Sequence, residues 1–136
     1  MSGLCLASGL LSAFVGTQAF TLAWTHSIEK VRWEEDWQVR GSALYLAEGR
    51  VRGSGAGMEP PEGSRLKNGV WRYPVGRELE RLELAHSAYT AGYELCVDGR
   101  CKPLHAWLPG LPAAPAQPTA VTLGACPAPG EPAEGQ

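Results

Sequence analysis

The stretch Phe20-Thr-Leu-Ala-Trp-Thr-His-Ser-Ile-Glu-Lys-Val-Arg-Trp-Glu-Glu-Asp-Trp-Gln-Val-Arg40 determines the fold class of this chain. Apolar and polar residues alternate over residues 20–29 and again over residues 31–40. A period of two is typical of a β-strand with one buried face, because successive side chains point to opposite sides of the strand. The stretch therefore predicts two neighbouring antiparallel strands, with aromatic residues on the buried side and charged residues on the other.

Each buried stripe contains one ionisable residue, His26 in the first and Glu35 in the second. If the strands pair directly around residues 30 and 31, His26 lies opposite Glu35, and Trp24 lies opposite Trp37. Lys30-Val31 is a poor two-residue turn, so we expect a longer loop, and a shift of register by two would place His26 against a tryptophan. A carboxylate beside a buried imidazole orients the ring and raises its basicity.

This expected pair of His26 and Glu35 has three interpretations. The two residues can satisfy each other inside the sheet, form part of a binding site, or serve an enzyme in which Glu35 orients His26 as a base. Support for the enzyme is thin, because Ser27 points to the opposite face of the strand and is no nucleophile for His26. A metal site completed by His86 and His105 matches no recognised spacing.

A glycine-rich loop follows the next expected strand. Residues 44–51 alternate like a strand, and Gly53, Gly55 and Gly57 follow with a spacing of two. The N–H groups of such a loop can turn toward an anion, but Pro60-Pro61 exclude the helix that familiar phosphate-binding loops require. Bending or close packing of the backbone explains these glycines more simply.

The cysteines predict disulfides. Asp98-Gly99 is typical of a two-residue hairpin turn, which places Cys96 opposite Cys101 in a non-hydrogen-bonded pair. Zinc is a poorer explanation, because a zinc knuckle needs a second ligand pair nearby and the other cysteines, Cys5 and Cys126, stand at the far ends of the chain. A Cys5–Cys126 disulfide requires that the N-terminal segment be retained. Disulfides indicate an oxidising compartment.

The N-terminal segment has more than one interpretation. Residues 1–28 contain no Lys, Arg, Asp or Glu. They are read as two strands, residues 3–7 and 10–15 with a turn at Ser8-Gly9, or as a signal-like segment over residues 1–19, or as a membrane anchor. A basic n-region is missing for a signal peptide, and small polar residues interrupt a membrane span.

Proline marks the C-terminal segment. Seven of the 11 prolines fall within the last 28 residues of the chain. Because proline lacks a backbone donor, we expect residues 109–136 to be a disordered tail, with a short strand at residues 121–123. The folded domain is then expected to span residues 1–108.

Length and charge exclude several classes of protein. The chain has 136 residues, with 12 Lys+Arg against 14 Asp+Glu and a formal net charge of -2. This balance fits neither a basic nucleic-acid-binding protein nor an acidic disordered chain. Repeated alternation, hairpin turns and the lack of helix-period segments predict one all-β domain, an antiparallel sandwich or partly open barrel of about eight short strands. The oligomeric state is not predicted.

Several of these features together resemble a bacterial family, domain of unknown function 1850. They are residues 20–30, Glu35, Gly55-Ala-Gly-Met58 and the Cys96 hairpin, and the resemblance extends over about residues 3–126. It implies a small extracytoplasmic domain with a His-Ser pair, a later Glu and a Gly-Met sequence. The candidate binding residues are accordingly His26, Ser27, Glu35, Gly55, Gly57 and Met58.

The same resemblance implies an accessory role. Genes of this family often lie beside TAXI-type TRAP transporters, which are solute importers with a periplasmic binding protein. We therefore expect a non-catalytic periplasmic binding domain whose partner is a TRAP-type binding protein or membrane subunit, with no cofactor, metal or nucleic acid. A cytoplasmic location is the alternative, because residues 1–19 make a poor signal. A small hydrolase or metal-binding enzyme, and a purely structural pair of His26 and Glu35, are the alternative functions.

Overall fold

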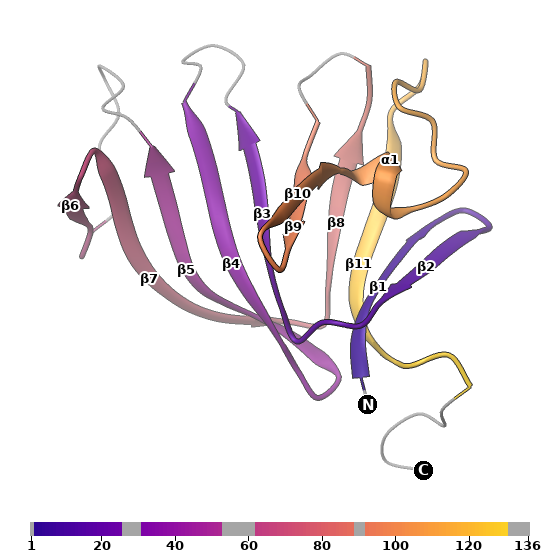
Figure 1. The fold of residues 1–136 in the computed structure, drawn as a ribbon, viewed down its shortest axis with the longest axis horizontal. Helices are drawn as coiled ribbons and strands as arrows, with labels where there is room; N and C mark the ends of the chain where they lie inside the picture. The colour runs from indigo at the N-terminus through magenta and orange to yellow at the C-terminus, as the bar shows by residue number, and fades with distance from the viewer. Residues whose placement is uncertain (1, 26–30, 53–61, 89–91, 131–136) are drawn as a thin grey trace.

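Two antiparallel sheets pack face to face in the computed structural model, which describes residues 2–25, 31–52, 62–88 and 92–130 (Figure 1). The smaller sheet has the strand order β2 (Leu11–Val15), β1 (Ser2–Ser8), β11 (Thr119–Pro127) and β8 (Arg81–His86). The larger sheet has the order β10 (Arg100–Pro103), β9 (Glu94–Val97), β3 (Ala19–Thr25), β4 (Arg32–Arg40), β5 (Ala43–Arg52), β7 (Val70–Leu79) and β6 (Arg65–Lys67). One short helix, α1 (Leu104–Trp107), follows β10. The predicted all-β sandwich is confirmed, with 4 strands in one sheet and 7 in the other in place of about eight in all.

The core lies between the two sheets. Leu4 and Leu6 of β1 meet Leu22 of β3 and Trp37 of β4, and all four side chains are at most 2% exposed. Burying one leucine side chain stabilises a fold by about 1.5 to 3 kcal/mol. Because every second residue of each strand points inward, the alternation in the sequence places these residues on the inner faces. The N-terminal strands are therefore part of the core.

The N-terminal segment forms the β1–β2 hairpin. Ser8 pairs with Leu11, so that Gly9 and Leu10 make a two-residue turn, and Gly9 has φ 57°. Glycine adopts this positive φ without steric cost, as the first position of such hairpin turns requires. Of the three readings of this segment, the structure has the two strands. Within the described residues, no helix has the length and apolar character needed to span a membrane.

The C-terminal segment departs from the expected tail. β11 pairs with β1 on one side and β8 on the other, and its Val121 and Leu123 are fully buried. The expected strand at residues 121–123 is thus part of a longer strand, so residues 119–127 belong to the folded domain and not to a disordered tail. Prolines crowd residues 109–118, but residues 119–126 contain none and alternate like a buried strand.

Both expected disulfides are present. Cys96 and Cys101 face each other across the β9–β10 hairpin, as the Asp98-Gly99 turn predicts. Cys5 of β1 bonds Cys126 of β11, a sequence separation of 121. In the chain-entropy account a loop of this length contributes about 5 kcal/mol, and a short hairpin loop contributes about 2 kcal/mol. The long-range disulfide therefore ties together the first and last strands of the fold.

The pairing of β3 with β4 differs from the simplest expected register. Trp24 lies opposite Trp33, and Leu22 lies opposite Glu35, a shift of four from the direct pairing. β3 ends at Thr25 and β4 begins at Arg32, so the connection is longer than a two-residue turn, as the poor turn sequence indicated. Because the shift is even, every side chain keeps its predicted face.

Candidate functional site

Glu35 lies on the inner face of β4, where the rest of the stripe is apolar. Its Oε1 atom accepts a hydrogen bond from Trp37 Nε1 at 3.3 Å. Glu35 is half-buried, and burial raises the pKa of its carboxyl group, which the Trp37 hydrogen bond lowers only in part. No basic side chain among the described residues forms an ion pair with it. Glu35 is therefore a carboxylate held in an environment that disfavours its charge.

Tyr73 reaches toward this carboxylate from β7 by crossing over a glycine. Glu35 lies opposite Gly49 on β5, and Gly49 lies opposite Tyr73 on β7. A Cβ atom at Gly49 would be 2.3 Å from Tyr73 Cζ and 2.4 Å from the phenol oxygen, so the ring occupies the space where a side chain would stand. Burial raises the pKa of Tyr73, and the negative charge of Glu35 raises it further. Gly49 thus gives Tyr73 access to the carboxylate.

Three more aromatic rings lie near β3 and β4, and one of them, that of Tyr93, is close enough to Glu35 to be affected by its charge. Trp24 and Trp33 stack across β3 and β4 with ring centroids 6.4 Å apart and planes 7° apart. Tyr93 is tilted by 58° against Trp24 at 5.6 Å, and its pKa is raised first by burial and then by the charge of Glu35. The carboxylate therefore acts on tyrosines that approach it from two sides. We call Glu35 with Trp24, Trp33, Tyr73 and Tyr93 the aromatic face.

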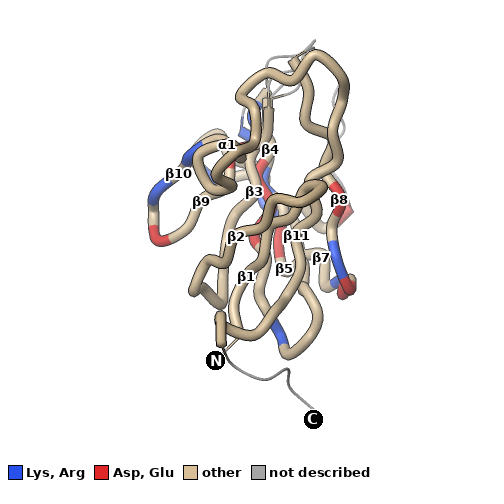
Figure 2. Tube along the Cα trace, turned by 90° about the vertical axis from the view of Figure 1, so that its right-hand side faces the viewer, with Lys and Arg blue, Asp and Glu red and all other residues tan. Residues whose placement is uncertain are grey.

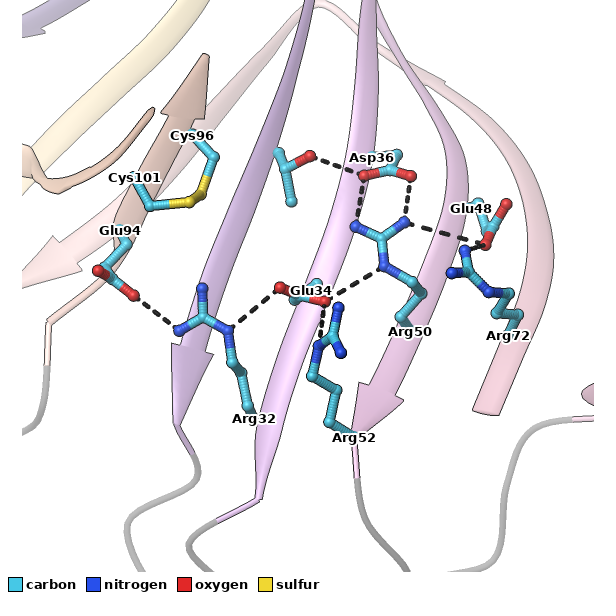
Figure 3. A network of polar contacts seen from close by, with 11 residues as sticks. Arg32, Glu34, Asp36, Glu48, Arg50, Arg52, Arg72, Glu94, Cys96 and Cys101 are labelled. Atoms are coloured by element: carbon cyan, nitrogen blue, oxygen red, sulfur yellow. Dashed lines mark hydrogen bonds and ion pairs between the residues drawn. A yellow bond between two sulfur atoms is a disulfide. The ribbon is translucent and has the colours of Figure 1, made fainter. Parts of the chain in front are cut away.

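The opposite face of the same sheet carries a network of ion pairs (Figure 3). Its members are Arg32, Glu34, Asp36, Glu48, Arg50, Arg52, Arg72 and Glu94. Glu34, only 8% exposed, accepts hydrogen bonds from Arg52 at 2.8 Å, Arg32 at 3.1 Å and Arg50 at 3.2 Å. Burial alone would raise the pKa of Glu34, but these three guanidinium groups hold it below its usual value. The acids of this face are thus neutralised by partners within the sheet, in contrast to Glu35.

Neither described histidine forms a hydrogen bond or an ion pair with Glu35 in the part of the chain that the structure describes. His86, which is 4% exposed, donates from Nε2 to the carbonyl oxygen of Pro112 at 2.7 Å. His86 and His105 line a hollow of about 350 Å³ together with Tyr93 and Glu94. Across the described ranges no group of three or more His, Cys, Asp or Glu side chains is arranged to hold a metal ion. The metal site that would join these histidines to Glu35 therefore has no support from the described residues.

Of the six candidate binding residues, only Glu35 falls within the described residues. The other five, His26, Ser27, Gly55, Gly57 and Met58, lie outside them. The predicted cross-strand pair of His26 and Glu35 is wrong, because Leu22 occupies the position opposite Glu35.

The sequence reading missed Tyr73 and Gly49. Nothing local in the sequence shows that the ring of Tyr73, on β7, reaches across β5.

The comparisons with known proteins identify one family. A domain of unknown function (DUF1850) matches residues 20–104. The matched segment contains all five residues of the aromatic face, which lie on β3, β4 and β7 and just before β9. No curated protein and no solved structure matches the chain.

Proposed function

The chain belongs to the DUF1850 family, and we propose that it is a non-catalytic binding domain that acts outside the cytoplasm as an accessory to a transporter. The aromatic face is its binding surface. The observation that carries this proposal is the position of Glu35, a half-buried carboxylate among aromatic rings, with no basic partner among the described side chains. In this proposal the aromatic face receives a side chain of a partner protein.

The disulfides support the location outside the cytoplasm. All four cysteines are paired, one pair within a hairpin and the other between the first and last strands. Disulfides persist in oxidising compartments and are rare where cellular thiols keep proteins reduced. We infer that the domain folds and works in the periplasm or an equivalent space.

The aromatic face fits a cationic group. Aromatic rings attract an ammonium or guanidinium group through their negative faces, and a nearby carboxylate adds a charge of the opposite sign. Trp24, Trp33, Tyr73 and Tyr93 are each partly exposed. A positive group beside Glu35 would favour the ionised carboxylate and so oppose the effect of burial on its pKa. We propose that the cation is an Arg or Lys side chain of a partner protein.

The partner that we propose is the periplasmic binding protein or a membrane subunit of a TRAP-type transporter. The family resemblance supports this choice through gene neighbourhood, and the extracytoplasmic location is compatible with it. The hydrolase and metal-enzyme alternatives depend on His26, which lies outside the described residues, and no observation on the described residues favours them.

The test is a dissociation constant for the oxidised full chain and a TRAP-type binding protein or membrane subunit encoded beside it. Glu35→Gln keeps the size of the side chain and removes its charge, and Glu83→Gln makes the same change at an exposed acid on β8 of the other sheet. We expect Glu35→Gln to weaken binding at least about tenfold, a loss of about 1.4 kcal/mol, and Glu83→Gln to leave it unchanged. Equal affinities for wild type and Glu35→Gln, or no complex with either protein, would contradict the proposal.

A further inference from the structure

The outermost strands of the two sheets differ in how they are protected. β8, β10 and β6 each carry two charged residues, and β10 also ends in a proline. β2 (Leu11–Val15) contains neither charge nor proline, and β1 and β11, the next two strands of the sheet, carry no charge either (Figure 2). Charges and prolines on an edge strand prevent pairing with another strand, so an edge that lacks them is available for pairing.

The outer edge of β2 presents unpaired backbone groups. Ser8 and Leu11 close the hairpin as a hydrogen-bonded pair, so Ala13 and Val15 also direct their backbone groups toward β1. The alternate residues Ser12 and Phe14 direct their N–H and C=O groups away from β1, and no described residue bonds them there. Two donors and two acceptors therefore point outward along this edge.

The hairpin tip beside this edge is also apolar and uncovered. Leu10 is 105% exposed, the largest value among the exposed large hydrophobic residues of the described chain. An exposed leucine at the end of an unprotected edge adds apolar area that pairing would cover.

From these observations we propose that β2 pairs antiparallel with β2 of a second copy of this chain, which joins the two small sheets into one continuous sheet. A two-fold axis at Ala13 brings Ser12 of each copy opposite Phe14 of the other. Each such pair exchanges two hydrogen bonds, which satisfies all the outward groups of both residues. Leu11 then meets Val15 of the other copy, and Leu10 meets Gly16.

The choice of a second copy follows from charge and symmetry. A two-fold axis places like residues near each other, and residues 1–28 contain no Lys, Arg, Asp or Glu that would repel their copies. The central residue, Ala13, is small enough to face itself across the axis. One strand pair buries less area than the roughly 1,200 Å² of a standard interface, so the dimer is weak and forms at high concentration.

The test is sedimentation of the oxidised full chain over a range of concentrations, from about 5 to about 500 μM. Ser12→Pro removes one outward donor without removing a hydrogen bond to β1, and Leu10→Lys places a charge at the hairpin tip. Ala85→Lys introduces the same charge on β8, at the opposite edge of the same sheet. Retention of both disulfides and of the tryptophan fluorescence spectrum shows that each variant is folded.

We expect the wild type and Ala85→Lys to dimerise alike, and both β2 variants to raise the dimer dissociation constant at least about tenfold. If Ser12→Pro fails to fold, Leu10→Lys alone decides the outcome. A wild type that stays monomeric at every concentration overturns the proposal, including the case in which β2 pairs with a strand of a different protein. A folded Leu10→Lys variant that dimerises like the wild type also overturns it.

Discussion

The contact between Gly49 and Tyr73 predicts a specific cost for Gly49→Ala. The added Cβ atom would lie 2.3 Å from Tyr73 Cζ, 2.4 Å from the phenol oxygen and 2.5 Å from Cε2. Ordinary contacts between carbon atoms are about 3.5 to 4.0 Å, so the ring has to move by more than about 1 Å. Overpacking of this kind costs about 1 to 3 kcal/mol, which exceeds the gain of up to about 1 kcal/mol that alanine brings to a strand.

The measurement is the free energy of unfolding from urea titration, with both disulfides intact. Gly124→Ala on β11 is the matched control, because the nearest atoms to its Cβ would be 3.9 Å away. We expect the control to stay within about 0.5 kcal/mol of the wild type. In a Tyr73→Ala background the obstacle is gone, so Gly49→Ala there should be neutral or stabilising.

The double-mutant comparison also supplies the result that would refute the reasoning. An equal cost of Gly49→Ala with and without the Tyr73 ring would show that the glycine is needed for its backbone and not for the passage of Tyr73. A Gly49→Ala variant as stable as the wild type would show that the ring does not cross β5 as described.

Three further predictions concern the charges and the disulfides. Burial raises the folded pKa of Glu35, so its ionisation opposes folding; this penalty is absent below the unfolded pKa of about 4.3 and is complete above the raised pKa. Denaturation of Glu35→Gln should therefore show a stability that improves relative to wild type as pH rises from about 4 to about 7, and a constant difference would contradict the assignment. Glu34→Gln leaves the surrounding arginines without their shared carboxylate and should cost about 2 to 4 kcal/mol in the same assay, whereas Glu78→Gln on β7 should cost less than about 0.5 kcal/mol. Serine replacement of the Cys5–Cys126 pair should lower the free energy of unfolding by about 3 to 5 kcal/mol and replacement of the Cys96–Cys101 pair by less, and the reverse order would count against the loop-length account.

Much of the fold can be predicted from the sequence because its signals are local. The alternation over residues 20–40 identifies both faces of β3 and β4, and the Asp98-Gly99 turn is sufficient to pair Cys96 with Cys101. The register of β3 against β4 is less local, since it depends on the length of the connection after Thr25. An even shift changes the cross-strand neighbour of each residue but not its face. Glu35 therefore lies on its predicted face, but opposite Leu22 and not opposite His26 as predicted.

Two features could not be obtained from local signals. The full length of β11 was not predicted, because prolines flank it on both sides and indicate a disordered segment. Its place between β1 and β8 depends on pairing with strands that are distant in the sequence. The approach of Tyr73 to Glu35 depends on three strands in register and on the missing side chain of Gly49. A glycine in an alternating strand is the one signal that could have indicated close approach of a neighbouring group.

The central claim, that a partner binds at the aromatic face, is tested most directly by side-chain NMR of the oxidised chain during titration with the TRAP-type partner. The indole signals of Trp24 and Trp33 and the carboxyl signal of Glu35 should shift on binding, while the guanidinium signals of Arg50 and Arg52 on the opposite face stay in place. Shifts confined to the arginine network, with the Glu35 signal unchanged, would contradict the claim and place the binding surface on the other side of the sheet.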